Sequence, residues 1–295
     1  MRLLSTVGLI IIFFFSIENT LFSQHLNQTD KGGFYLYWGY NRSAYTKSSL
    51  RLVGPGYDFR LNELKAEDRP EKVSLVYLNP KKITIPQFNV RMGYFFMDKW
   101  AVTFGYDHMK YIMRHPQTVK IKGHVDPGVS TLWNGDYNNQ ETELPYNQIH
   151  YENSDGNNYI RFGVARYFDL LSVGEKNWFR IRGVVEGTVG FLLPFNDLDF
   201  GGKKNLKTIS VSGYGISLHP GLRLEFFNHL FFEGHFSGGF LHHVRVRTRP
   251  DDKSSFARQA YGFIETDFVF GYTWRFNRKK YDALKTGNKE DGAFL

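Results

Sequence analysis

The sequence IETDFVFGYTWRF occupies residues 264–276, close to the end of the chain. Ile264 and the aromatic residues from Phe268 to Phe276 fall on one set of alternate positions, and Glu265 and Asp267 fall on the other. A period of two indicates a β-strand with one apolar and one polar face. We place this strand at about 261–276. It is longer than the roughly 9–11 residues that a tilted strand needs to cross a bilayer.

Earlier segments of the chain repeat this alternation. They lie at about 33–46, 84–96, 100–113, 158–169, 178–193, 209–227 and 230–246. Long connections at 47–83, 114–157, 194–208 and 247–260 alternate with short turns. Long extracellular loops on one side and short periplasmic turns on the other are typical of outer-membrane barrels. The sequence therefore predicts an all-β fold, a closed antiparallel transmembrane β-barrel of about eight strands.

The polar faces of these strands hold glycines and a balanced set of charges, whereas the apolar faces are rich in large aromatics. A soluble sandwich, the main competing fold, would carry its polar residues outside in water. The interior of an eight-stranded barrel is narrow enough for side chains to fill it. We therefore predict an interior polar network of Arg180, Arg182, Glu186, Arg223, Glu225, Glu233, His235, Glu265, Asp267 and Arg275.

The chain divides into three parts. Residues 1–23 combine Arg2 with an apolar run from Val7 to Phe15, the pattern of a cleaved signal peptide. Residues 24–276 form the barrel, and 277–295 form a polar tail that we place in the periplasm. The formal net charge of +8 comes from scattered Lys and Arg, which disfavours nucleic-acid binding and suits contact with anionic lipid headgroups.

The alternating aromatic strand ending at Phe276 resembles the closing strand of the small bacterial outer-membrane β-barrel proteins. In that family the insertion machinery reads this strand. The resemblance implies residence in the outer membrane of a Gram-negative cell envelope. The family usually stops at the final aromatic residue, whereas this chain runs on from Asn277 to Leu295.

A second, local resemblance concerns His235 and Ser237, two positions apart on one strand, with Glu265 on the next. This arrangement is similar to that of the lipid A deacylases, which are also outer-membrane barrels. The resemblance implies Ser237 as nucleophile, His235 as base and Glu265 as the residue that orients the base. Gly238 stands where the family has Asn, and the strand phase turns His235 and Ser237 inward. We therefore favour an interior hydrogen-bond network and keep the deacylase as the alternative.

Two groups of basic residues lie near the expected outer rim: Lys203, Lys204 and Lys207, and Arg245, Arg247 and Arg249. They are candidates for binding lipopolysaccharide phosphates, and ordinary solvated loop charge remains the alternative. The histidines His108, His115, His124 and His150 show no metal-ligand spacing, so we expect no metal site. No cofactor is expected either.

Three function hypotheses follow. The first is a non-enzymatic outer-membrane barrel that acts through its long loops as a structural, adhesion or partner-binding component. The second is the deacylase-like esterase, and the third is a narrow pore. The expected partners are outer-membrane lipid, lipopolysaccharide and other outer-membrane proteins.

Overall fold

The computed structural model describes residues 29–70, 87–174 and 178–275. The predicted signal peptide and the tail 277–295 lie outside these residues. None of the described residues forms a helix long and apolar enough to cross a membrane.

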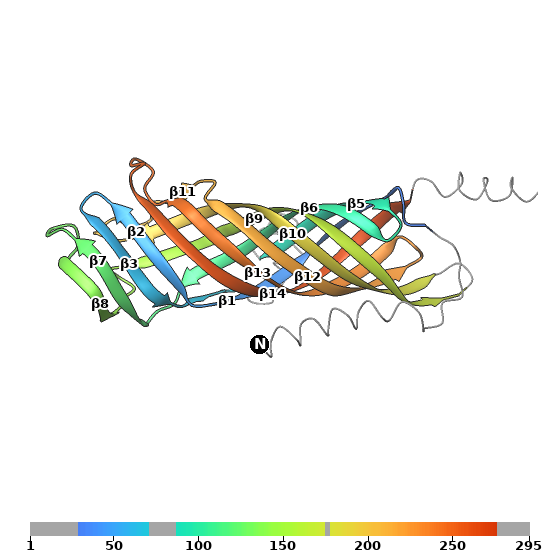
Figure 1. Cartoon of the computed structure of the whole chain (residues 1–295), viewed down its shortest axis with the longest axis horizontal. Coiled ribbons are helices and arrows are strands. Elements are labelled where there is room, and N and C mark those ends of the chain that lie inside the picture. The colour runs from blue at the N-terminus through green and yellow to red at the C-terminus, as the bar shows by residue number, and fades with distance from the viewer. Residues whose placement is uncertain (1–28, 71–86, 175–177, 276–295) are drawn as a thin grey trace, which may run out of the picture.

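A ring of antiparallel strands forms the body of the molecule (Figure 1). In order around the ring these are β1 (Gly33–Tyr45), β5 (Phe88–Met97), β6 (Trp100–Met113), β9 (His150–Val173), β10 (Phe179–Asp199), β12 (Gly213–Phe226), β13 (Leu230–Arg247) and β14 (Phe256–Arg275). Pairing of β1 with β14, from Gly33 opposite Arg275 to Tyr45 opposite Phe263, closes the ring. The predicted closed barrel and its eight strands are confirmed.

Short turns gather at the end of the barrel where β1 begins and β14 ends (Figure 1). Asp98 and Lys99 join β5 to β6, and residues 227–229 join β12 to β13. Lys99, Phe227 and Asn228 have positive φ, as tight hairpin turns require. We call this end periplasmic and the opposite end extracellular.

The predicted long loops are largely strands, which corrects the expectation of irregular connections. They contain β2 (Ser48–Gly54), β3 (Tyr57–Leu64), β4 (Ala66–Glu67), β7 (Thr118–Val125), β8 (Gly135–Glu143) and β11 (Thr208–Ile209). The physical reason lies in their own alternation: Leu50 and Leu52, Phe59 and Leu61, and Val119 and Ile121 are all buried. Each of these pairs flanks a basic residue, so each segment has an apolar and a polar face.

Strands β2, β3, β7 and β8 pair in that order and form what we call the extracellular layer. The layer is linked to the barrel wall by β14, which extends further toward the extracellular end than β1 does. Residues Phe263 to Arg275 of β14 pair with β1, and Phe256 to Arg258 pair with Val53 to Arg51 of β2. One strand therefore belongs both to the closed barrel and to the extracellular layer.

Beneath this layer lies an apolar core. Leu50, Leu61 and Ile121 pack in one cluster with Tyr151 of β9 and Leu198 of β10. A second, smaller cluster near the periplasmic turns contains Tyr35, Phe95, Tyr167 and Phe231, among others. Apolar side chains thus occupy the lumen toward both ends, and the charged network lies next to the second cluster and between the two.

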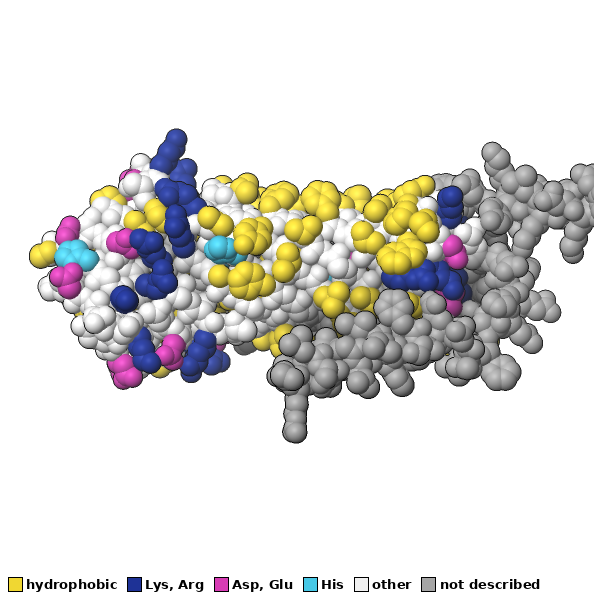
Figure 2. All heavy atoms as spheres, in the orientation of Figure 1, with side chains coloured by type: hydrophobic (Ala, Val, Ile, Leu, Met, Phe, Trp, Pro, Cys, Tyr) yellow, Lys and Arg dark blue, Asp and Glu magenta, His cyan; other side chains and the backbone are white. Residues whose placement is uncertain are grey.

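The outer wall of the barrel carries a belt of exposed apolar side chains (Figure 2). It includes Tyr94, Val102, Phe104, Phe162, Val164, Val189, Ile216, Leu218, Leu222, Phe232, Phe236, Ile264, Phe268 and Phe270. A soluble monomer rarely exposes so large a contiguous apolar surface. Lipid contact requires it, and ring closure satisfies the backbone groups that lipid would leave unpaired.

Two interior glycines make room for aromatic side chains. A Cβ on Gly93 would meet the ring of Tyr35, and a Cβ on Gly271 would meet the ring of Phe231. Both rings are buried in the lower apolar cluster. Small residues on the polar face therefore allow large side chains from other strands to cross the narrow lumen.

Candidate functional site

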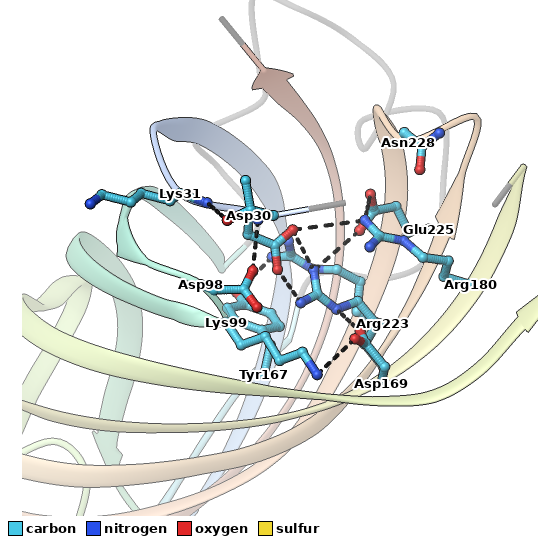
Figure 3. A network of polar contacts seen from close by, with 12 residues as sticks. Asp30, Lys31, Asp98, Lys99, Tyr167, Asp169, Arg180, Arg223, Glu225 and Asn228 are labelled. Atoms are coloured by element: carbon cyan, nitrogen blue, oxygen red, sulfur yellow. Dashed lines mark hydrogen bonds and ion pairs between the residues drawn. The ribbon is translucent and has the colours of Figure 1, made fainter. Parts of the chain in front are cut away.

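The periplasmic mouth of the barrel is filled by ion pairs centred on Asp30. Its carboxylate accepts hydrogen bonds from Arg182 and from Arg275, the latter at 2.7 Å. Its backbone N–H donates to Asp98 Oδ1 at 2.8 Å, which ties the start of the chain to the β5–β6 turn. Figure 3 shows Asp30 and Glu225 turned toward the same arginines. Asp30 is 2% exposed, so these charges are matched away from water.

Glu225 and Asp169 extend this mouth cluster around the wall. Glu225 pairs with Arg180 and, at 2.7 Å, with Arg275. Asp169 lies 2.9 Å from Arg182 Nε and 3.0 Å from Lys99 Nζ. Each arginine therefore faces at least one carboxylate, which compensates for much of the cost of burying it.

Deeper in the lumen, His235 lies between two carboxylates. Its Nδ1 is 2.6 Å from Asp267 Oδ1, and its Nε2 is 2.9 Å from Glu233 Oε1. Both nitrogens can donate only when the ring carries both protons. Glu233 also pairs with Arg223, whose guanidinium lies over the ring of Phe231.

A third group links Arg91 and Arg161 through Asp107. Arg91 lies 3.3 Å from Asp107 and also pairs with Glu186. Arg161 Nε lies 2.8 Å from the other oxygen of Asp107. The guanidinium of Arg161 also contacts His219. The interior is thus a stack of matched charges.

The structure turns the side chains of all ten predicted network residues into the lumen. Nine are buried residues, and the side chain of Arg275 is 6% exposed. Sequence reasoning left out Asp30, Arg91, Asp107, Arg161 and His219. The last four had the inward phase and could have been included. Asp30 precedes β1, where no alternation marks its direction.

The structure does not bring Ser237, His235 and Glu265 together as a triad. Ser237 Oγ lies 2.6 Å from Nδ1 of His219, while both nitrogens of His235 face other carboxylates. Glu265 accepts a hydrogen bond from Ser43 at 3.0 Å. All three side chains are buried inside the barrel wall, on the side away from the apolar belt.

A closed wall with an apolar exterior and a charged interior decides the class of fold. The chain folds as a small outer-membrane β-barrel. Neither a protein-family model nor a curated protein sequence matches it. Among solved structures it is similar to the outer-membrane protein OprG of Pseudomonas aeruginosa, with 11% identity, a TM-score of 0.38 and coverage of 83% of this chain and 97% of that one.

Two other structures illustrate the range of such barrels. The attachment invasion locus protein Ail of Yersinia pestis shows 10% identity and a TM-score of 0.31, with 83% of this chain and 99% of that chain covered. The protease OmpT of Escherichia coli shows 8% identity and a TM-score of 0.30, with 85% and 100% covered. At these values no property of either protein can be transferred to this barrel.

The basic residues predicted near the outer rim of the barrel separate into different environments. Lys203 and Lys204 are exposed, whereas Lys207 pairs with Asp155. Arg245 faces outward and lies over the ring of Phe256 at 4.0 Å.

The other two arginines of that group are held by backbone carbonyls. Arg247 donates to the carbonyl of Arg249 at 2.9 Å. Arg249 is buried and donates to the carbonyls of Leu198 and Phe200, because β13 ends at Arg247 and its alternation ends there too. The guanidinium of Arg249 therefore cannot serve as an outer phosphate site, which corrects its place among the candidates.

A histidine pair lies in the extracellular part of the barrel. His115 Nδ1 donates to the carbonyl of Leu144 at 2.9 Å, and its Nε2 lies 3.0 Å from Nδ1 of His150. His150 Nε2 lies 3.0 Å from Glu152. Burial lowers the pKa of His115, and the hydrogen bond from His150 lowers the pKa of Glu152. Among the described residues no cluster of His, Asp and Glu could hold a metal ion.

We expect acid to loosen this histidine pair. When folding lowers the pKa of a group, the folded state is most stable above the ordinary pKa of that group, which is about 6.5 for histidine. The folded state then loses stability as the pH falls below that value. Burial disfavours the charged form of His115, so protonation of its ring works against the folded arrangement. Protease resistance of the extracellular layer should therefore be lower at about pH 5 than at about pH 7.5.

His115→Ala should remove this acid-side loss. His124→Ala is the control, because its partners Asp136 and Asp126 raise the pKa of His124 and so act in the opposite direction. An unchanged pH profile in His115→Ala would contradict the assignment.

Proposed function

We propose that this protein is a non-enzymatic component of the outer membrane that presents its extracellular layer as a binding surface. The observation that carries the proposal is the contrast between the two halves of the molecule. The middle of the lumen is filled by ion pairs, whereas four strands beyond the barrel form a sheet over an apolar core that they share with the upper ends of barrel strands such as β9 and β10. Segments that served only as connectors would not need that core.

The proposed binding surface includes β8, whose side chains are polar and accessible. Residues 138–141, read Asn-Asn-Gln-Glu, are exposed, and within residues 29–70, 87–174 and 178–275 the strand β8 pairs only with β7. An open strand edge can accept a strand from another chain. This supports a protein partner at the extracellular end.

The two other hypotheses have less support. A narrow pore needs a continuous polar path, and matched charges and two apolar clusters occupy the lumen here. A deacylase needs its nucleophile within reach of an ester in the lipid. Ser237 is 1% exposed and hydrogen-bonds to His219 instead of His235.

Site-specific crosslinking on intact cells tests the proposal, and the absence of native cysteine makes single-Cys variants clean probes. Gln140→Cys on β8 should react on intact cells with an impermeant maleimide that carries a photo-crosslinker, and illumination should then capture a discrete partner protein. Phe236→Cys, in the apolar belt, is the matched control and should capture no protein. Capture from Phe236 alone, or labelling of Gln140→Cys only after the cells are permeabilised, would rule the proposal out.

A further inference from the structure

Four basic residues lie side by side on neighbouring strands at the base of the extracellular layer. Arg258 of β14 is paired with Arg51 of β2, Arg51 with Arg60 of β3, and Arg60 with Lys122 of β7. We call these four residues the cation row. Because each is the direct cross-strand partner of the next, the row crosses four strands without interruption.

The cation row faces outward. Its strand neighbours Leu52, Phe59, Ile121 and Ala257 are buried in the core of the layer, so alternation turns the basic side chains to the other face. Arg60, Lys122 and Arg258 are exposed, and Arg51 is half-buried.

Like charges directly opposite each other destabilise a sheet, because their Cβ atoms are only about 4.5–5.5 Å apart. One carboxylate offsets the row: Asp58 accepts two hydrogen bonds from Arg51, at 2.8 and 2.5 Å. That bond lowers the pKa of Asp58, and Arg60 and Arg258 lower it further. In the described parts of the chain, Arg60, Lys122 and Arg258 have no acidic partner, so the row retains an excess of positive charge.

The row lies just beyond the apolar belt. Ile264 is the last exposed apolar residue of the belt on β14, and Arg258 follows six positions further toward the extracellular end. At about 3.3 Å per residue and a tilt of about 45°, Arg258 lies roughly 14 Å above Ile264. On the neighbouring strand β13 the belt reaches higher, to the exposed Val244, which lies between the pairs His243–Gln259 and Val246–Ala257 and so is level with Arg258. The row therefore adjoins the edge of the belt, in the headgroup zone. Figure 2 shows Lys and Arg side chains gathered as a band between the belt and the extracellular end.

An aromatic ring holds part of this band in place. Arg258 lies 5.2 Å from the ring of Phe256, and Arg245 lies over the same ring at 4.0 Å. Stacking restricts the two guanidinium groups, so less freedom is lost when an anion binds.

We propose that the cation row binds the phosphate groups of lipopolysaccharide in the outer leaflet. The arginine forks supply paired donors for phosphate oxygens, and Lys122 supplies a further charge. The position in the headgroup zone favours a phosphate fixed to a lipid over a soluble phosphate. The row meets the β8 surface only at Lys122, which lies opposite Asn138. The proposal needs no protein partner, because the three arginines lie on β14, β2 and β3.

The test compares the full-length barrel, purified in mild detergent, with the variant Arg60→Gln/Lys122→Gln/Arg258→Gln. Binding is measured to purified lipopolysaccharide and to the same lipid after phosphatase treatment. The unaltered protein should prefer the phosphorylated form. The variant should lose roughly 100-fold in affinity for it, since each of the three cations contributes about fivefold near an anionic surface. Arg51 is left unchanged because it pairs with Asp58.

The matched control, Lys31→Gln/Lys47→Gln/Lys65→Gln, removes the same charge from exposed lysines outside the row and outside the predicted phosphate-binding candidates. It should bind within about twofold of the unaltered protein. Equal losses in both variants would mean that only net charge matters and would overturn the proposal. So would equal binding of dephosphorylated lipid, or displacement by inorganic phosphate at the same concentration as lipid phosphate. Unchanged heat-modifiable mobility in gels verifies that the variants are folded.

Discussion

Asp30→Ala is expected to lower the free energy of unfolding by about 3–5 kcal/mol, the usual cost of breaking a buried ion pair on one side. The carboxylate is the shared acceptor of Arg182 and Arg275, and it is almost fully buried. Without it, the remaining carboxylates of the mouth cluster must neutralise the same arginines. Urea unfolding in detergent micelles, followed by gel mobility with and without heating, measures the loss.

Asp136→Ala is the control for Asp30→Ala, because the side chain of Asp136 is 89% exposed. Its effect should stay within about 0.5 kcal/mol. The double variant Asp30→Asn/Arg182→Gln should be less destabilised than the sum of the single changes, since it removes an acid and a base together. A loss no larger than that of Asp136→Ala would show that the mouth cluster contributes little to stability.

Phe59→Ala has the second large expected effect, about 3–5 kcal/mol, because it leaves a cavity in a packed core. The Phe59 ring lies 5.3 Å from Trp133 and 5.1 Å from Phe200, so it joins the extracellular layer to the end of β10. We expect proteases to cleave the layer in this variant while the barrel itself stays heat-modifiable.

Phe236→Ala makes the same chemical change on the lipid-facing wall, where Phe236 is 62% exposed. Lipid can fill the space that the ring leaves, so the cost should be well below that of Phe59→Ala. If both variants resist proteases equally, the extracellular layer does not depend on its own core.

Alternation alone predicted the barrel strands, because each lies between lipid and a filled lumen and must keep two distinct faces. The segments around Leu52, Phe59 and Ile121 alternate as well, but over only seven or eight residues. Such short runs fit a loop as readily as a strand. Their partners are also far away in sequence: Phe59 lies opposite Gly123, and Val53 lies opposite Phe256.

The candidate sites show the same limit. Strand phase predicted that Arg182 and Glu225 point inward, but not that Asp30 would join them. Arg249 follows Arg247 at the expected spacing, yet the end of β13 turns it into the core. The cation row depends on the register of four strands, and a slip of one residue in any one of them would turn the side chains of that strand to the other face.

The double role of β14 has a consequence for the order in which the molecule assembles. Its partners β1 and β2 come from the other end of the chain, whereas β3 and β7 reach β14 through β2. A second, short contact with the wall is the pairing of β4 with β6. The hairpins β2–β3 and β7–β8 are local and can form early, since short loops close fast. Their attachment to the wall must wait for the last strand to be delivered. Any truncation within β14 should therefore release the extracellular layer from the wall and also open the barrel between β1 and β14. The arrival of β14 thus completes both the barrel and the attachment of the layer.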